Sequence, residues 1–215
     1  MYDTILFDLD GTLTDPKLGI TKCVQYALAK KGIQEDDLDK LIPFIGPPLL
    51  WSFKEFYGLS ELDAKEAIEF YRERFVEVGM YENGVYPGIE ALLRKLKQQG
   101  KKLLVATSKP TVYSVTILEH FGLNGYFDAI VGSNLDGTRI EKEDVIEFAL
   151  SELGGVIRDK LIMVGDRKHD IIGARKNGLK VIAVAYGYGS LDELQRAEPD
   201  YIASSVKELE ELLTK

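Results

Sequence analysis

The sequence predicts a doubly wound, Rossmann-like α/β fold with a small helical domain inserted into it. Short apolar runs without polar alternation recur along the chain, which is typical of parallel strands covered on both faces. Amphipathic stretches of helical period separate the later runs, and this alternation is the pattern of a parallel sheet. One interval, residues 16–84, lacks any convincing strand. We therefore expect an α/β core of residues 1–15 and 85–215 and a helical unit of residues 16–84.

Six apolar runs are the expected strands of the core. In chain order they are Thr4–Leu9, Leu103–Thr107, Ala129–Gly132, Leu161–Val164, Val181–Ala185 and Tyr201–Ala203. Helices are expected between them, because apolar residues return at three- and four-residue spacing on one face. Two such faces are formed by Ile89, Leu92, Leu93 and Leu96 and by Val145, Ile146, Ala149, Leu150 and Leu153.

The interval of residues 16–84 has its own apolar pattern and its own turns. Gly32, Gly58 and the run Gly46-Pro47-Pro48 are turn signals that divide it into helical stretches. We expect the chain to enter and leave this bundle near Asp15-Pro16-Lys17 and Asn83-Gly84. Two apolar stripes are expected to form the core of the bundle, namely Ile20, Val24, Ala27 and Leu28 in one helix and Ala64, Ile68, Tyr71, Phe75 and Val78 in another.

Composition and charge describe a soluble globular protein. Of 215 residues, 45% are hydrophobic and 29% charged, which is enough apolar surface for a packed core. No apolar run approaches the roughly 18 residues of a membrane span, and the acidic N-terminus does not match an export signal. The net charge is −8, without a basic stripe for a nucleic-acid polymer. The single cysteine, Cys23, fits a reducing interior, so we expect a cytoplasmic protein, either monomer or dimer.

Acidic residues directly follow two of the expected strands. Asp8 and Asp10 stand at the end of the first strand, and Asp166 and Asp170 come just after Leu161–Val164. Ligands of open α/β sheets bind beyond the carboxyl ends of the strands, and carboxylates gathered there are costly unless a cation neutralises them. If the two strands are neighbours, these oxygens would suit Mg²⁺. The alternatives are a turn with an Asp cap at the first strand and an exposed helix N-terminus at Asp170.

Two further segments stand where a strand meets a helix. Thr107 and Ser108 follow the second core strand, and hydroxyl and backbone N–H groups at a helix start form a seat for an anion. The same residue types also serve as ordinary helix caps. Lys142 stands at an expected helix start, where a cation opposes the helix dipole. This misfit indicates another task, with a solvated surface lysine as the alternative.

In chain order, these segments resemble the motifs of the haloacid dehalogenase-like phosphohydrolases. The order is Asp8-Leu9-Asp10-Gly11-Thr12, a strand ending in Thr107, then Lys142, then Gly-Asp-x-x-x-Asp from Gly165 to Asp170. The resemblance covers nearly the whole chain, and the helical insertion is similar to the family's type-1 cap. Three stretches are similar to the 5′-nucleotidase branch near the phosphoglycolate phosphatases, namely Phe44-Ile45-Gly46-Pro47-Pro48-Leu49, Leu135-Asp136-Gly137-Thr138-Arg139 and Gly187-Tyr188-Gly189-Ser190.

The resemblance implies a Mg²⁺-dependent phosphatase for small soluble phosphomonoesters. It gives Asp8 the role of nucleophile, forming an aspartyl-phosphate, and Asp10 that of general acid and base. Lys142 would pair with Asp8 and the transferring group, with Lys109 as its rival. Ser108 departs from the Asn of many relatives, so only its backbone N–H is expected to serve. The implied Mg²⁺ ligands are Asp8, the Asp10 carbonyl, Asp166 and Asp170, and the implied phosphate-binding residues are Thr107, Ser108 and Gly11.

Specificity is expected to reside in the helical insertion. Its candidate contacts are Phe44, Gly46, Pro47 and Trp51, although packing in the bundle core is the alternative for the aromatics. Nucleoside 5′-monophosphates are the first expected substrate class, followed by phosphoglycolate and then by a sugar-phosphate mutase reaction. A receiver-like signalling domain that accepts a phosphoryl group and a catalytically silent binding module are the alternatives from other classes. Four unbroken motifs in this order favour the enzyme.

Overall fold

The computed structural model describes residues 2–153 and 157–214, which form two compact units. The α/β core comprises Met1–Asp15 and Val85–Lys215, and the helical unit comprises Pro16–Gly84. Two short strands, β2 (Thr14–Asp15) and β3 (Gly84–Val85), pair where the chain passes from one unit to the other. The helical unit is therefore a single insertion after the first strand of the core.

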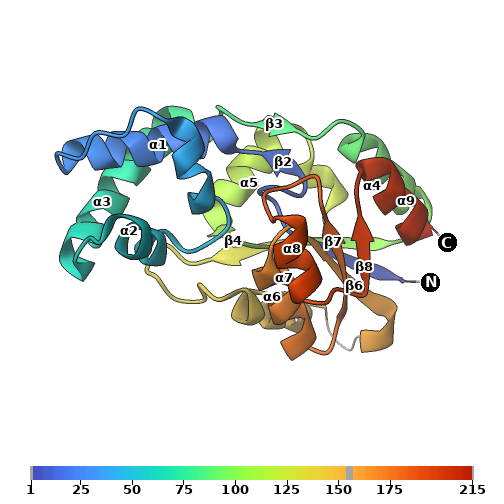
Figure 1. Ribbon diagram of the computed structural model, residues 1–215. Helices are drawn as coiled ribbons and strands as arrows, with labels where there is room; N and C mark the ends of the chain where they lie inside the picture. Colours follow the sequence, from blue (N-terminus) through green and yellow to red (C-terminus); the bar gives the residue numbers. More distant parts are fainter. Residues whose placement is uncertain (1, 154–156, 215) are drawn as a thin grey trace. The chain divides into compact units, whose positions relative to one another are not determined.

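A six-stranded parallel sheet forms the centre of the core (Figure 1). Its order is β5-β4-β1-β6-β7-β8, and every neighbouring pair runs parallel. The chain adds strands on one side of β1 and then returns to add the others on the opposite side. Ligands bind at such a switch point, beyond the carboxyl ends of the strands. The strands are β1 (Thr4–Phe7), β4 (Lys102–Pro110), β5 (Ala129–Ser133), β6 (Leu161–Gly165), β7 (Lys180–Val184) and β8 (Tyr201–Ala203).

The predicted fold class is confirmed, and each predicted strand of the core is present. β1 is buried along its whole length, as expected for a strand with helices over both faces. β4 runs past its predicted end at Thr107 as far as Pro110, and its pairing with β5 is irregular between Ala106 and Pro110. Such an irregularity re-aims side chains at the end of a strand, and here it falls at the predicted anion seat.

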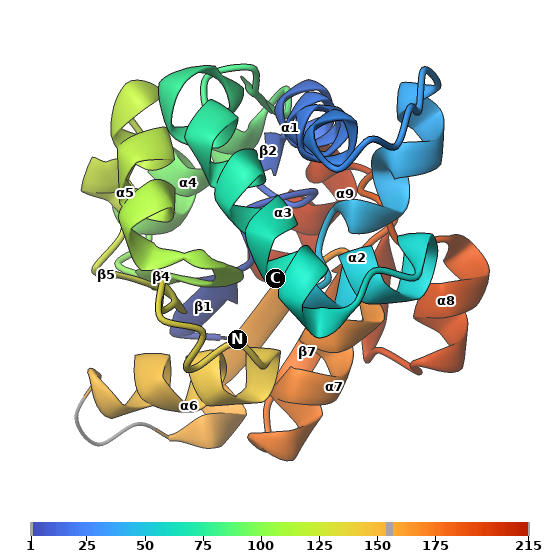
Figure 2. The same ribbon diagram turned by 90° about the vertical axis from the view of Figure 1, so that its left-hand side faces the viewer.

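Helices cover both sides of the sheet. In Figure 2, α4 and α5 lie on one side and α6 and α7 on the other. On the second side, Leu6 and Met163 of the sheet pack with Val145, Ile146 and Ile171 of the helices in one apolar cluster. The helices of the core are α4 (Ile89–Gln98), α5 (Thr111–His120), α6 (Lys142–Ser151), α7 (Lys168–Lys176), α8 (Leu191–Arg196) and α9 (Val206–Thr214).

The helical unit has a core of its own, in which α1 packs against α3. The predicted stripes are present, except that Val78 is 45% exposed, so its predicted burial is wrong. The π-helical turn Phe75–Gly79 causes this, because its wider turn takes Val78 off the face that holds Phe75. The elements are α1 (Lys17–Lys30), a 3₁₀ helix (Leu38–Phe44), α2 (Leu49–Tyr57), α3 (Glu61–Arg74) and this π-helical turn.

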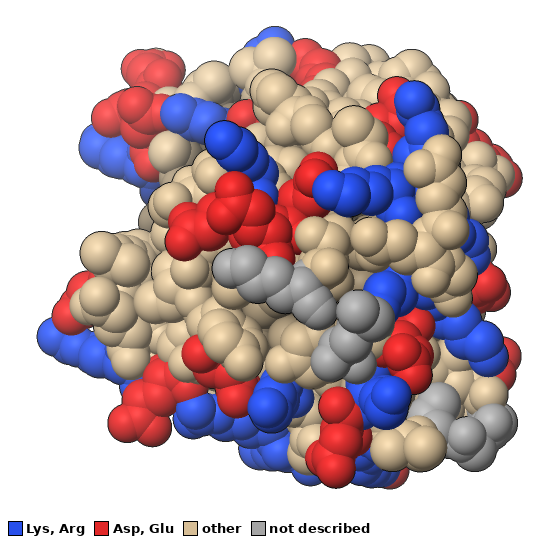
Figure 3. All heavy atoms as spheres, turned by 90° about the vertical axis from the view of Figure 1, so that its right-hand side faces the viewer, with Lys and Arg blue, Asp and Glu red and all other residues tan. Residues whose placement is uncertain are grey.

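One face of the molecule carries charged side chains of both signs (Figure 3). On the face shown in Figure 3, Lys and Arg side chains are interspersed with Asp and Glu, and no continuous basic stripe crosses this face. Among the described helices, none combines the length and apolarity that crossing a bilayer demands.

Candidate active site

The two acidic clusters meet at the carboxyl edge of the sheet. β1 pairs with β6, and the Asp8 amide donates a hydrogen bond to the Val164 carbonyl at 2.8 Å. Asp8, Asp166 and Asp170 each offer a carboxylate oxygen, and these three atoms lie within 4.8 Å of one another. All three side chains are buried, as is Asp10 nearby in the chain. The strand order therefore brings residues remote in sequence into one acidic site.

The ammonium group of Lys142 lies among these carboxylates. Its Nζ is 2.8 Å from Asp8 Oδ1 and 2.7 Å from Asp170 Oδ1, and it donates a hydrogen bond to the Ala106 carbonyl at 3.2 Å. Burial acts to lower the pKa of Lys142, but the charges of Asp170 and Asp8 outweigh it and raise the pKa. Lys142 is consequently a buried cation, and the alternative of a surface lysine is excluded.

Burial and mutual repulsion raise the pKa values of two acids in this site. Burial is the largest cause that raises the pKa of Asp166 well above its ordinary value, and the charges of Asp170 and Asp8 add to it. Burial also raises the pKa of Asp170 to about 6, against the opposing charge of Lys142. Neighbouring carboxylates disfavour each other's charged forms. A further cation among them would remove this repulsion.

Carboxylate oxygens without hydrogen bonds test whether a metal fits here. Oδ1 of Asp8, Asp166 and Asp170 is buried, and that of Asp166 accepts no hydrogen bond from any residue that the structure describes. Two of these oxygens form ion pairs with Lys142, whereas no described cation pairs with Asp166 Oδ1. A carboxylate oxygen buried without a partner is costly, and carboxylate oxygens are the ligands that Mg²⁺ prefers. The donor set therefore fits a hard divalent cation.

The three residues proposed for phosphate binding border the same edge. Gly11 has φ +79°, and a Cβ there would lie 2.1 Å from Asp166 Oδ2, so the loop after β1 needs glycine to pass the acidic site. Thr107 is buried, and its Oγ1 accepts a hydrogen bond from the Lys109 N–H at 3.3 Å. Ser108 is half-buried. Because β1 and β4 are neighbours, these residues follow adjacent strands.

Lys109 has a partner that sequence reasoning missed. Its Nζ lies 2.7 Å from Asp10 Oδ2, and both side chains are almost entirely buried. Burial raises the pKa of Asp10, and the Lys109 ammonium opposes that rise. The sequence suggested Lys109 only as a rival phosphate-binding lysine, because the irregular end of β4 that turns it toward Asp10 is not visible in the sequence.

Tyr188 is a second residue that sequence reasoning missed. Its N–H donates a hydrogen bond to Asp166 Oδ2 at 2.7 Å, and its hydroxyl donates to Asp15 Oδ1. The neighbouring Tyr186 hydroxyl donates to the Thr12 carbonyl at 3.0 Å. These bonds tie the loop after β7 to Asp166 and to the loop after β1. The signal was the stretch Gly187-Tyr188-Gly189-Ser190, whose resemblance pointed only to a branch of the family.

The candidate specificity residues lie in and after the 3₁₀ helix of the helical unit. Phe44 is 2% exposed, and its ring packs edge-on against Phe53 and Phe56 at centroid distances of 5.0 and 5.3 Å. Gly46-Pro47 follows it in a turn, with Pro47 buried. Trp51, on α2, is 49% exposed. Phe44 is therefore a core residue of its unit, and Trp51 is the accessible aromatic.

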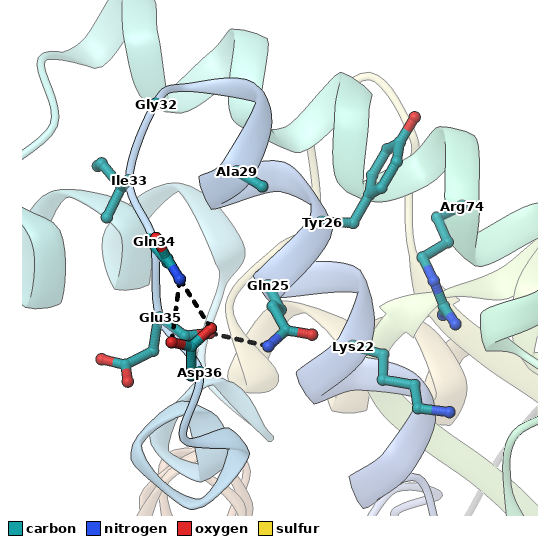
Figure 4. A pocket seen from close by; sticks show the side chains of 10 residues that line it. All are labelled: Lys22, Gln25, Tyr26, Ala29, Gly32, Ile33, Gln34, Glu35, Asp36 and Arg74. Atoms are coloured by element: carbon teal, nitrogen blue, oxygen red, sulfur yellow. Dashed lines mark hydrogen bonds between the residues drawn. The ribbon is translucent and has the colours of Figure 1, made fainter.

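A hollow of about 670 Å³ lies on α1 of the helical unit, and Figure 4 shows the side chains that line it. The Gln25 amide donates to the Glu35 carbonyl at 2.8 Å. Lys22 and Arg74 both pair with Glu82, each at 2.8 Å. These polar groups already bind one another. The acidic site at the sheet edge is therefore the better candidate for a ligand-binding site.

Known proteins of similar sequence indicate the family of this chain. The family model described as haloacid dehalogenase-like hydrolase matches residues 5–184. The chain is 50% identical to a 5′-nucleotidase of Pseudomonas aeruginosa, covering 99% of this chain and 96% of that protein. It is 37% identical to the tyrosine-protein kinase PtkA of Mycobacterium tuberculosis, covering 97% and 72%.

A solved structure extends the agreement to the fold. The crystal structure of a "predicted phosphatase" from Clostridium acetobutylicum matches with a TM-score of 0.96 and 55% identity, covering 100% of this chain and 99% of that chain. The resemblance of the four sequence motifs is thus confirmed over almost the whole chain. The chain belongs to the haloacid dehalogenase-like hydrolase family, among its phosphatases.

Proposed function

We propose that the chain is a Mg²⁺-dependent phosphomonoesterase that works through an aspartyl-phosphate on Asp8, with nucleoside 5′-monophosphates as its substrates. The observation that carries this proposal is the buried ion pair at 2.8 Å between Lys142 and Asp8, beside two more acids. A carboxylate can attack an anionic phosphoryl group only where fixed cations offset the repulsion. The 50% identity to a 5′-nucleotidase supports the substrate class.

The acidic site would hold Mg²⁺ through the side chains of Asp8, Asp166 and Asp170 and the backbone carbonyl of Asp10. When bound, Mg²⁺ supplies positive charge that stabilises the phosphoryl oxygens during transfer. Asp166 differs from the other two acids, because Lys142 pairs with Oδ1 of Asp8 and of Asp170, whereas the Tyr188 N–H holds Asp166 Oδ2 and Asp166 Oδ1 has no hydrogen-bond partner among the described residues.

The reaction would proceed in two halves. First, an Asp8 oxygen bonds to phosphorus, the bond to the ester oxygen breaks, and Asp10 donates a proton to the leaving alcohol. Then Asp10 takes a proton from water, the water oxygen bonds to phosphorus, and the acyl-phosphate bond breaks to release phosphate and restore Asp8. Dividing the reaction in this way makes each step easier, and a positioned acid and base adds about 10²–10⁴-fold.

Four further residues would hold the transferring group. Lys142 stabilises the charge that spreads over the phosphoryl oxygens in the transition state. The Thr107 hydroxyl and the backbone N–H groups of Ser108 and Gly11 would bind those oxygens. Each lies at the end of β1 or β4 or begins α6, so the sheet edge itself would form the phosphate site.

We further propose that the helical unit acts as a cap that selects the substrate. The core residues contact the phosphoryl group that all phosphomonoesters share, so selection needs contacts to the remainder of the molecule. Trp51 is an exposed aromatic of this unit, and its large ring is suited to stack on a nucleobase. Trp51→Ala should raise KM for AMP more than for phosphoglycolate, with Phe56→Leu as a control for local packing. Equal changes for both substrates would contradict this role.

A substrate panel tests the proposed function. Inorganic phosphate release is followed from AMP, UMP, phosphoglycolate and sugar phosphates, with Mg²⁺ and with EDTA. We expect Mg²⁺-dependent release that is fastest from the nucleotides. Faster release from phosphoglycolate would show that phosphoglycolate, not a nucleotide, is the preferred substrate. Isomerised sugar phosphate without phosphate release would indicate a mutase. A long-lived phosphoprotein after acetyl phosphate treatment would favour a receiver. No release from any compound would refute the proposal.

The covalent intermediate has its own test. With p-nitrophenyl phosphate, whose leaving group departs without a proton, Asp10→Asn should still form the aspartyl-phosphate but lacks the base that activates water, so the intermediate should accumulate and be detected as a phosphorylated protein by mass spectrometry. Asp8→Asn in the same experiment is the control, because it lacks the oxygen that accepts the group. If neither Asp10→Asn nor a fluoro-metal mimic of phosphate traps a species on Asp8, the covalent route is wrong.

A further inference from the structure

We propose that Lys109 is a positioning residue for Asp10, holding one carboxylate oxygen so that the other faces the leaving group. This inference deepens the proposed function and rests on it. Lys109 Nζ lies 2.7 Å from Asp10 Oδ2, with the two side chains 6% and 10% exposed. An ion pair this close and this little solvated constrains both groups, whereas a surface pair does so weakly.

The other oxygen of Asp10 shows what the pair accomplishes. Asp10 Oδ1 is buried and accepts no hydrogen bond from any residue that the structure describes. A carboxylate held at neither oxygen would turn about its Cβ–Cγ bond. Because Lys109 holds Oδ2, Oδ1 remains as the oxygen for proton transfer. A general acid needs a fixed orientation of this kind, since its proton must come within hydrogen-bond reach of the leaving oxygen.

Each carboxylate of the first motif has its own lysine. Asp8 pairs with Lys142 from α6, and Asp10 pairs with Lys109 from β4. Lys142 also faces Asp170 and therefore belongs to the nucleophile and metal side of the site. This arrangement divides the two tasks of the reaction. One lysine serves phosphoryl transfer, and the other serves the residue that moves the proton.

The backbone that carries Lys109 is itself held in place. Its N–H donates to Thr107 Oγ1 at 3.3 Å, and its carbonyl accepts from the Ser114 hydroxyl at 3.5 Å. Gly132 of β5 passes so close that a Cβ there would lie 2.1 Å from the Lys109 carbonyl. A fixed backbone limits the positions that the Lys109 ammonium can reach. This restriction favours its contact with Asp10.

A double-mutant cycle tests the inference. Lys109→Met removes the charge at similar side-chain length. We expect it to lower kcat/KM for AMP by about 10- to 100-fold, less than the roughly 10²–10⁴-fold that acid–base catalysis contributes, because Asp10 itself is still present. The loss should be much smaller for p-nitrophenyl phosphate, whose leaving group departs without a proton. Lys109→Arg should recover part of the activity. In the Asp10→Asn background, Lys109→Met should have little further effect, because the residue it positions is gone.

Lys101→Met is the matched control. Lys101 precedes β4, is 5% exposed and donates to the Tyr2 carbonyl, so it is a buried lysine away from the acidic site. Its loss should affect both substrates alike and slightly. Equal losses for AMP and p-nitrophenyl phosphate in Lys109→Met, or additive losses in the double variant, would overturn the inference. If Lys109→Met does not fold, Lys109→Arg is compared on the two substrates by the same criterion. Wild-type protein inactive on both substrates would refute the proposed function instead.

Discussion

Charged side chains are buried at the carboxyl edge of the core sheet, whereas on the helical unit many of them are exposed on helix surfaces. At the sheet edge, four buried carboxylates share two buried lysines, and several oxygens lack hydrogen bonds from described residues. On the helical unit, pairs such as Lys65–Glu61 and Arg72–Glu69 lie on helix surfaces. A buried unbalanced charge is costly, whereas an exposed pair contributes little. The difference indicates that the buried acids of the sheet edge suit a cation, whereas the exposed pairs of the helical unit are already neutralised.

The largest expected effect comes from Asp8→Asn. The amide retains the shape of the side chain but is not a nucleophile, so phosphate release should fall by about 10⁴-fold or more. Steady-state assays with AMP measure this loss, and circular dichroism checks the fold. Glu61→Gln, which changes an exposed side chain of the helical unit, should keep full activity. Appreciable residual hydrolysis by Asp8→Asn would rule out Asp8 as nucleophile.

Lys142→Met should show the next largest effect. Removing the cation strips charge stabilisation from the transition state, so kcat should fall by about 10²–10³-fold. It also leaves Asp8 and Asp170 buried without their shared partner, at a cost in unfolding free energy of about 3–5 kcal/mol. Phosphate release and urea unfolding measure the two effects. A variant as stable as the wild type in metal-free buffer would show that the acids do not depend on this lysine.

Metal and pH should act together on stability. Because burial raises the pKa of Asp170 to about 6, and that of Asp166 upward as well, the metal-free fold binds more protons than the unfolded chain. Stability from these groups is present below their ordinary pKa near 4 and is lost as the pH rises through about 6. Mg²⁺ replaces those protons, so it should raise the unfolding temperature more at about pH 7.5 than at about pH 5.

Thermal unfolding with and without Mg²⁺ at the two pH values measures this coupling. Asp166→Asn is the control variant, because it removes one proposed ligand and should abolish the Mg²⁺-dependent rise. An equal rise at both pH values, or a rise that persists in Asp166→Asn, would place the bound ion elsewhere in the protein.

The smallest effect is expected from Lys65→Met on α3. Its pair with Glu61 spans one helical turn at 2.7 Å, and both side chains are well exposed. Water already solvates both groups, so neither kcat/KM for AMP nor the unfolding temperature should change measurably. Lys31, which faces both Asp63 and Glu66, offers the comparison within the same unit. A large loss in Lys65→Met would break the contrast between the two regions.

The fold was largely predictable because its signals are local. Burial on both faces makes β1 and its neighbours continuous apolar runs, and helical spacing of apolar residues marks the intervening helices. The two predictions about the fold that failed also have local causes in the backbone. The π-helical turn that exposes Val78 and the extension of β4 past Thr107 depend on backbone geometry that side-chain spacing does not express.

For the candidate site, the sequence by itself determined that Asp8 and Asp166 stand at strand ends, since a parallel sheet places all its carboxyl ends on one edge. It also placed Lys142 at a helix start, where a cation opposes the helix dipole, but it left a surface lysine as the alternative. Only the tertiary structure decided which lysine faces which acid. Lys142 reaches Asp8 and Lys109 reaches Asp10 because of the strand order around β1 and the irregular end of β4. Such pairings depend on distances of a few ångströms between elements far apart in the chain, and no spacing along the sequence encodes those distances.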